Sequence, residues 1–73
     1  MSDETVHSDV AGTVWKIEKT VGDAVQADDV IMILESMKME IPVVAPRAGV
    51  IAEILVDEAG PVNEGEALVR LSA

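Results

Sequence analysis

The chain has 73 residues, which is enough for one small domain close to the lower size limit for a self-sufficient core. It has no cysteine, which excludes disulfides, thiolate chemistry and iron–sulfur sites and is consistent with the cytosol. The formal net charge of −9 argues against nucleic acid or an anionic membrane as a partner, and no apolar run approaches the roughly 20 residues of a membrane span.

Residues 1–5 are acidic and polar, unlike a signal peptide, and are predicted to form a loose tail before a single domain over residues 6–73. We therefore expect a cytoplasmic protein. Twelve valines and six isoleucines favour strands over helices, and no long helical period appears. The predicted strands cover residues 6–10, 12–18, 30–34, 39–43, 50–56 and 67–71.

Two of these strands carry a local irregularity. The second is interrupted around Trp15, the only aromatic residue, and the fourth contains Pro42, which cannot donate to a ladder and so predicts a sheet edge. Turns are expected at 22–23, 44–49, 58–61 and around residue 65. The single histidine, His7, and the adjacent Asp28 and Asp29 lack further ligands at metal-site spacing, so no metal site is expected.

The two halves of the chain repeat one pattern with a constant offset of 37 residues. The matching pairs are Ala11-Gly12 with Ala48-Gly49, Val14 with Ile51, Ile17 with Ile54, Val25 with Val62, Asp29 with Glu66, Ile31 with Leu68, and Leu34 with Leu71. Gly22 and Gly60 fall one place out of register. The repeat predicts an all-β fold: a flattened β-barrel or sandwich of two small antiparallel sheets, six to eight short strands and pseudo-two-fold symmetry.

The hairpin that joins the halves is the one unrepeated feature, and its centre would be Met37-Lys38. A tight two-residue hairpin needs positive φ at both central residues, which Asn-Gly adopts easily and Met-Lys does not. Unless a longer loop relaxes the turn, we expect strain on the order of 1–3 kcal/mol per residue, which tends to persist at functional sites.

Lys38 allows three interpretations: a solvated turn residue, a catalytic amine, or an acceptor for covalent modification. Nearby Glu35 and Glu40 favour the protonated amine, which is a poor nucleophile unaided. No Ser/His/Asp triad or glycine-rich phosphate loop is recognisable, so an enzyme is not expected. An acceptor needs only to hold its amine outward, because a separate enzyme can supply the base and the activated acyl group.

The run Glu35-Ser36-Met37-Lys38-Met39 resembles the biotin-attachment signature, usually Glu-Ala-Met-Lys-Met, with Ser36 in place of alanine. Residues 11–14, 45–49 and 60–65 resemble the paired half-motifs of the same family, and the similarity spans about residues 6–72. The chain therefore resembles the biotinyl/lipoyl attachment domains, as a stand-alone attachment protein or a minimal biotin carboxyl carrier. The resemblance implies a single hybrid motif of the barrel-sandwich hybrid type.

It also implies a non-catalytic carrier. Lys38 would be biotinylated by a biotin protein ligase and would carry carboxybiotin between biotin carboxylase and carboxyltransferase sites on separate polypeptides. Met37 and Met39 would help the ligase and the partner subunits recognise the hairpin while packing around the turn. Glu35 and Ser36 complete the recognition motif, Glu35 as a ligase contact or a solubilising charge.

Two alternatives stay open. Lipoyl domains share the expected fold and modify a hairpin lysine, typically within Asp-Lys-Ala, so Lys38 could carry lipoate, although the methionines favour biotin. An unmodified acidic interaction module is the third hypothesis. The chain departs from the family pattern at Asp28, which stands where the second half has Gly65, and the ungapped repeat leaves no room for the protruding loop of some carriers.

Overall fold

The computed structural model describes residues 3–72, which form eight β-strands and no helix. The strands are β1 (Glu4–His7), β2 (Gly12–Ile17), β3 (Ala24–Val25), β4 (Val30–Ser36), β5 (Met39–Val44), β6 (Gly49–Ile54), β7 (Pro61–Val62) and β8 (Ala67–Ser72). Over this described range, no helix is long and apolar enough to cross a membrane. The predicted all-β fold is confirmed, with the strand number at the upper end of the expected range.

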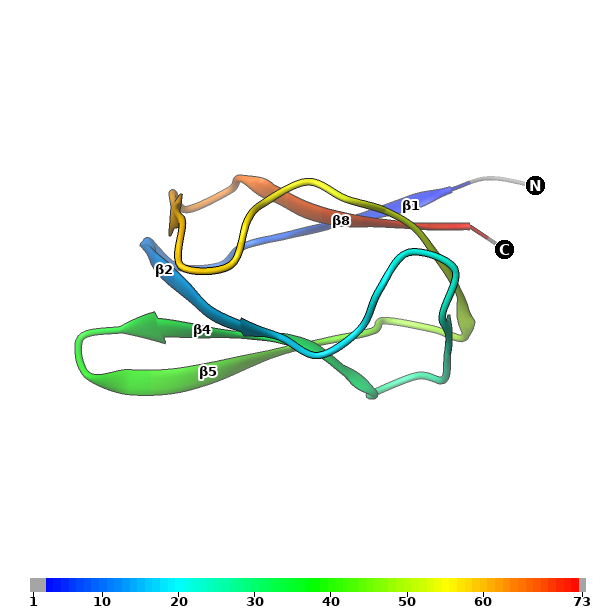
Figure 1. Ribbon diagram of the computed structural model, residues 1–73, viewed down its shortest axis with the longest axis horizontal. Helices are drawn as coiled ribbons and strands as arrows, with labels where there is room; N and C mark the ends of the chain where they lie inside the picture. Colours follow the sequence, from blue (N-terminus) through cyan, green and yellow to red (C-terminus); the bar gives the residue numbers. More distant parts are fainter. Residues whose placement is uncertain (1–2, 73) are drawn as a thin grey trace.

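The strands form two antiparallel sheets that face each other as a flattened sandwich (Figure 1). We call the sheet with strand order β5-β4-β2-β7 the hairpin sheet, and the sheet with order β1-β8-β6-β3 the terminal sheet. Pro42 lies on β5, an edge strand of the hairpin sheet, as its missing N–H predicts.

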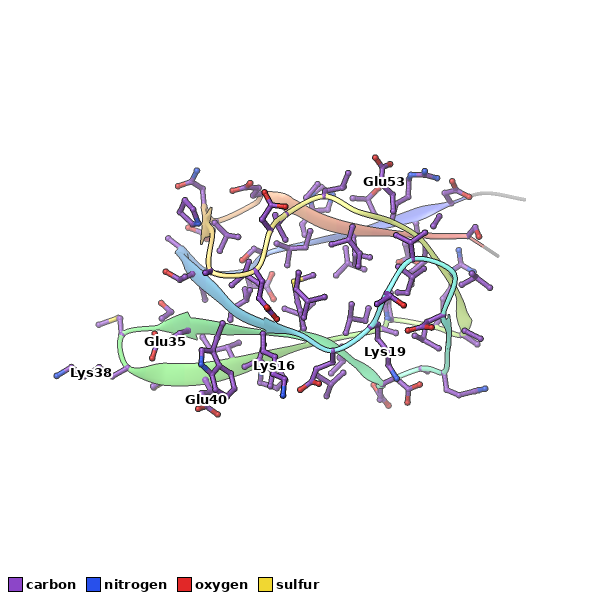
Figure 2. The ribbon with its side chains drawn as sticks, in the orientation of Figure 1. Lys16, Lys19, Glu35, Lys38, Glu40 and Glu53 are labelled. Carbon is purple, nitrogen blue, oxygen red and sulfur yellow. The ribbon has the colours of Figure 1, made fainter. Side chains whose placement is uncertain are left out.

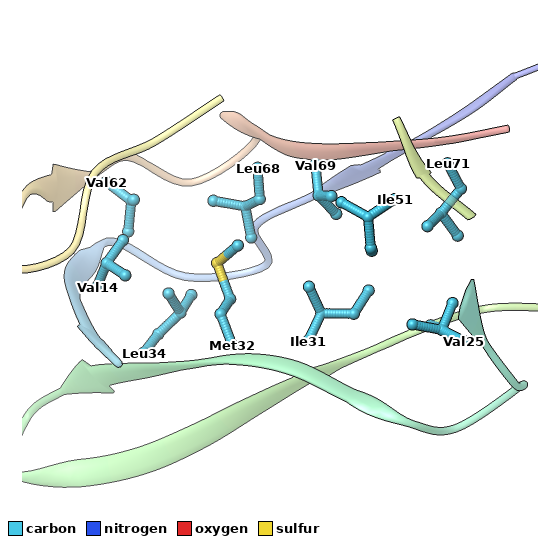
Figure 3. Close-up of a cluster of buried hydrophobic side chains, with 11 residues drawn as sticks. Val14, Val25, Ile31, Met32, Leu34, Ile51, Val62, Leu68, Val69 and Leu71 are labelled. Atoms are coloured by element: carbon cyan, nitrogen blue, oxygen red, sulfur yellow. The ribbon is translucent and has the colours of Figure 1, made fainter. Parts of the chain in front are cut away.

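Aliphatic side chains from the inner faces of both sheets fill the space between them (Figure 3). The fully enclosed large side chains are Ile31, Met32, Leu34, Ile51, Leu68, Leu71, Val14 and Val69. They come from β2, β4, β6 and β8, the two central strands of each sheet, whose alternate residues point to one face. Bulges in β4 and β8 turn the consecutive residues Ile31-Met32 and Leu68-Val69 toward the core together. The core therefore needs no aromatic residue, and Trp15 stays half-exposed outside it.

The predicted pseudo-two-fold symmetry is present in the strand order and in the turns. Strand β2 corresponds to β6 and β3 to β7, each 37 residues apart, and the two sheet orders interchange under this correspondence. Backbone hydrogen bonds repeat as well: Glu18 N donates to Ile31 O at 2.8 Å, and Leu55 N donates to Leu68 O at 2.9 Å. The bulges repeat as well. The register shift in β2 between Val14 and Lys16 confirms the irregularity expected at Trp15 and recurs in β6 between Ile51 and Glu53. A second shift, in β4 between Val30 and Met32, recurs in β8 between Ala67 and Val69.

The apparent glycine mismatch between Gly22 and Gly60 is resolved by the backbone angles. The counterpart of Gly22, with φ of 96°, is Ala59, with φ of 69°, and Gly60 does not take a left-handed conformation. The N–H of Gly22 donates to Ile51 O, and the N–H of Ala59 donates to Val14 O. The repeat therefore has no local shift. The second half places an alanine where the turn requires positive φ.

The N-terminal boundary differs from the prediction. Strand β1 begins at Glu4, so residues 4 and 5 of the predicted loose tail pair with β8, while residues 1 and 2 lie outside the described range. The strand ends at His7, and the chain then bends at Asp9 and Val10, where the Ser8 hydroxyl donates to the Val10 carbonyl at 2.6 Å.

Candidate functional site

The turn between β4 and β5 is the tight two-residue turn that the sequence predicts. Ser36 on β4 pairs directly with Met39 on β5, which leaves only Met37 and Lys38 between the strands. Their φ angles are 53° and 65°, in the left-handed region that side chains other than glycine occupy at a cost of about 1–2 kcal/mol per residue. The expected two-residue turn with positive φ at both central residues is therefore confirmed, and the relaxed longer loop is excluded.

The turn presents Lys38 at one extreme of the molecule, with its amine directed away from both sheets (Figure 2). The side chains of its neighbours are also outside the core, with Met37 92 % and Met39 61 % exposed. The other two lysines lie elsewhere, Lys16 on β2 and Lys19 just after it (Figure 2). Lys38 is thus set apart from the other lysines by its position at the tip of the hairpin.

The base of the hairpin is fixed to strand β2. The hydroxyl of Ser36 donates to the Ala11 carbonyl at 2.8 Å. Next to it, Gly12 lies so close to the backbone of Glu35 that a Cβ at this position would approach the Glu35 carbonyl oxygen more closely than the 3.0 Å that real Cβ atoms keep. These two contacts fix the strand ends from which the turn projects. The sequence repeat points to Gly12, but it gives no sign of this close approach.

Two carboxylates flank the turn on the same pair of strands. Glu35 and Glu40 lie directly opposite each other on β4 and β5, and neither forms a salt bridge within residues 3–72. Like charges opposite each other destabilise an antiparallel pair. Both side chains are exposed, so they give the hairpin an acidic flank behind Lys38.

The histidine and the adjacent aspartates lie outside the hairpin. His7 lies on β1 in the terminal sheet, where its Nδ1 is 3.1 Å from the Gly65 carbonyl oxygen. Asp28 has a φ of 73°, like its counterpart Gly65, and Asp29 accepts a hydrogen bond from Gln26 N at 2.8 Å. The two aspartates therefore shape a turn. Among the described residues, no cluster of three or more His, Cys, Asp or Glu could hold a metal ion.

Comparisons with known proteins agree with this geometry. Residues 4–71 match the biotin/lipoyl family described as "Biotin-requiring enzyme". The chain is 46 % identical over 68 residues to the "Biotin/lipoyl attachment protein" of Bacillus subtilis (strain 168), covering 93 % of each chain.

Solved structures give the same result. Kluyveromyces lactis urea carboxylase contains a region with a TM-score of 0.93 and 32 % identity, which covers 99 % of this chain and 6 % of that one. The lipoyl domain of the 2-oxoglutarate dehydrogenase complex from Azotobacter vinelandii has a TM-score of 0.76 and 39 % identity, covering 88 % of this chain and 81 % of that one. The chain belongs to the biotin/lipoyl attachment domain family.

Proposed function

We propose that this carrier domain holds biotin on Lys38 and moves a carboxyl group between a biotin carboxylase and a carboxyltransferase. The proposal depends chiefly on one observation: the single turn without a counterpart in a two-fold scaffold presents one amine at the far end of the molecule. The turn keeps two residues other than glycine in the left-handed conformation despite its cost, and such strained conformations are typical of functional sites.

The geometry suits an acceptor whose reaction is driven by another enzyme. In the proposed reaction, a biotin protein ligase supplies biotinyl-AMP, and Nζ of Lys38 attacks its acyl carbon. AMP leaves, an amide forms, and a base on the ligase takes the proton from the amine. The chain's contribution is to keep that amine exposed and unobstructed, as it is in Figure 2.

The hairpin also suits the transport step. Bound biotin supplies a ring nitrogen that takes up and releases a carboxyl group. The contacts of Ser36 and Gly12 at the hairpin base hold the root of the arm, while the lysine side chain stays free to rotate. An arm with a fixed root raises the effective concentration of its end at each partner site within its reach.

Biotin is favoured over lipoate by the residues beside the lysine. Met37 and Met39 match the biotin signature, and both are far more exposed than packing around the turn requires. Such side chains are available to a ligase that reads the tip. Lipoate on Lys38 is the second candidate, because the relatives include both biotin and lipoyl domains.

Intact mass of the protein tests the proposal. The unmodified chain is incubated with ATP and either a biotin protein ligase plus biotin or a lipoate ligase plus lipoate. We expect one biotin-sized addition with the first ligase and little addition with the second. A dominant lipoate addition would reverse the order of the two candidates.

Lysine variants locate the modification. Lys38→Arg keeps the charge and should abolish the addition, whereas Lys16→Arg and Lys19→Arg should leave it unchanged. Addition that survives in Lys38→Arg would contradict both candidates, and so would the absence of any addition to the parent chain with either ligase.

A further inference from the structure

The outer face of the hairpin sheet carries an apolar row that the core does not use. Ile33 on β4 pairs with Lys16 on β2 and with Pro42 on β5, and Trp15 is the extra residue of the β2 bulge beside Lys16. Trp15 is 50 % exposed, Pro42 is exposed, and neither Trp15 nor Ile33 packs against the core cluster. We call Trp15, Ile33 and Pro42 the hairpin row.

The pseudo-two-fold symmetry supplies an internal reference for this row. The equivalent positions on the terminal sheet, 37 residues away, are Ala52, Arg70 and Thr5. There Arg70 donates to Glu53 at 3.2 Å and pairs with Asp3, and these hydrogen bonds raise the pKa of its guanidinium above the ordinary value. Two faces with one architecture thus differ in chemistry. One is covered by its own ion pairs, and the other presents an exposed tryptophan and an exposed proline beside a half-buried isoleucine.

Folding does not require this difference, because the equivalent face of the same scaffold has small and polar residues at these positions. An exposed apolar row with no role in the core indicates a surface that is covered in a complex. Tryptophan is among the residues most enriched at the energetic centre of protein interfaces.

The charges beside the row define the chemistry of the partner. Glu35 and Glu40 lie between the row and the tip, on the same two strands, and have no cationic partner within residues 3–72. The chain also has a net charge of −9. A complementary surface would therefore be apolar at its centre, with basic side chains on the side nearer the tip.

The distances favour an enzyme that acts on Lys38. Pro42 is four residues from Lys38, or roughly 13 Å along a strand. A standard protein interface covers about 800 Å² per partner, a patch roughly 30 Å across. A protein that encloses the hairpin tip and extends over the hairpin sheet would therefore cover the row as well.

We propose that the hairpin row is the docking surface for the biotin protein ligase that loads Lys38, which would contact it with an apolar surface flanked by basic side chains. This inference rests on the proposed function. It adds to the recognition motif at the tip a second contact, contributed mainly by Trp15 and Ile33.

Steady-state biotinylation by a purified biotin protein ligase, with saturating biotin and ATP, tests the docking surface. In the double variant Trp15→Ala and Ile33→Ser, we expect KM for the carrier to rise at least tenfold while kcat stays within twofold. Val50→Ser is the matched control, because Val50 is an exposed aliphatic residue, 37 % exposed, on the terminal sheet. It should leave KM within twofold. Glu40→Gln should raise KM and weaken its dependence on salt.

Several results would overturn the inference. The inference fails if KM of the double variant stays within twofold of the parent value. It also fails if Val50→Ser raises KM as much as the double variant does. If KM is unchanged but the double variant abolishes a dimer seen by sedimentation equilibrium, a second copy covers the row. If KM is unchanged but loading alters Trp15 fluorescence in the isolated protein, the chain's own arm covers it.

Two controls keep the test decisive. Thermal melting must show that the double variant is folded. If it is not folded, the single variants Trp15→Ser and Ile33→Thr replace it. Each should raise KM for the carrier at least threefold. A KM within twofold of the parent in both would overturn the inference. A parent chain that takes no biotin overturns the proposed function together with this inference, whereas a loaded parent with unaffected variants overturns the inference alone.

Discussion

Replacing the two turn residues by Met37→Asn and Lys38→Gly should stabilise the unmodified protein. Both positions have positive φ, at 53° and 65°, and together they cost about 2–4 kcal/mol relative to residues that accept this conformation. Asparagine and glycine remove most of that cost. Glycine offsets about 0.4–1 kcal/mol of this gain, because it gives the unfolded chain more conformational freedom. A net gain of about 2 kcal/mol follows.

The expected shift in melting temperature is large because the domain is small. An unfolding entropy of about 2.1 cal/mol/K per residue gives roughly 150 cal/mol/K for this chain. Each kcal/mol therefore moves Tm by about 6–7 °C, and the double variant should melt roughly 13 °C higher. Far-ultraviolet circular dichroism of the unmodified proteins, followed through thermal unfolding, measures this shift.

A matched pair of substitutions separates backbone strain from side-chain effects. Met37→Leu with Lys38→Arg keeps residues that resist positive φ, so its Tm should lie within a few degrees of the parent. The single variants Met37→Asn and Lys38→Gly should each give part of the gain. A double variant that melts at or below the parent temperature would refute the strained two-residue turn.

Three further predictions concern the same scaffold. Gly22→Ala should lower the free energy of unfolding by about 1 kcal/mol because φ there is 96°, whereas Ala59→Gly at its counterpart should be neutral or slightly stabilising. If both substitutions lowered the melting temperature equally, the two turn positions would not be equivalent. Gly12→Ala should cost about 1–3 kcal/mol in denaturant unfolding, because its Cβ would press on the backbone of Glu35, and a loss below about 0.5 kcal/mol would show that β2 moves aside freely. Ser36→Ala should cost about 1 kcal/mol, or about 6 °C in Tm, by removing its hydrogen bond, and an unchanged Tm would mean that this bond does not hold the hairpin base.

The architecture could be predicted from the sequence because its signals are carried by side chains. The repeat of aliphatic residues fixed the two-fold relation, and Pro42 indicated an edge strand. The positive φ at Met37 and Lys38 followed from the length of the turn. Residue type and spacing predict each of these features, and both can be read from a single sequence.

Other features depend on tertiary contacts and were missed or misplaced. Strands β3 and β7 have two residues each, too few for any periodicity, and exist only by pairing with β6 and β2. Glu4 joins β1 because β8 offers it a partner, although its local sequence resembles a tail. Ala59 accepts positive φ because its N–H bonds to Val14 O, which its residue type does not suggest. The hairpin row appears only once its symmetry-related face is known.

The two-fold relation also explains why the β4–β5 turn has no counterpart in the scaffold. A rotation that exchanges the sheets carries the β4–β5 turn to the place where β8 ends and β1 begins, so the second turn of the pattern is replaced by the two chain ends. Figure 1 shows the start of β1 and the end of β8 together at the opposite extreme of the molecule from the β4–β5 turn. Lys38 and the hairpin row therefore lie away from the strand ends at which the described residues begin and finish. The similar region of Kluyveromyces lactis urea carboxylase, which makes up 6 % of that chain, has the same fold within a much longer polypeptide.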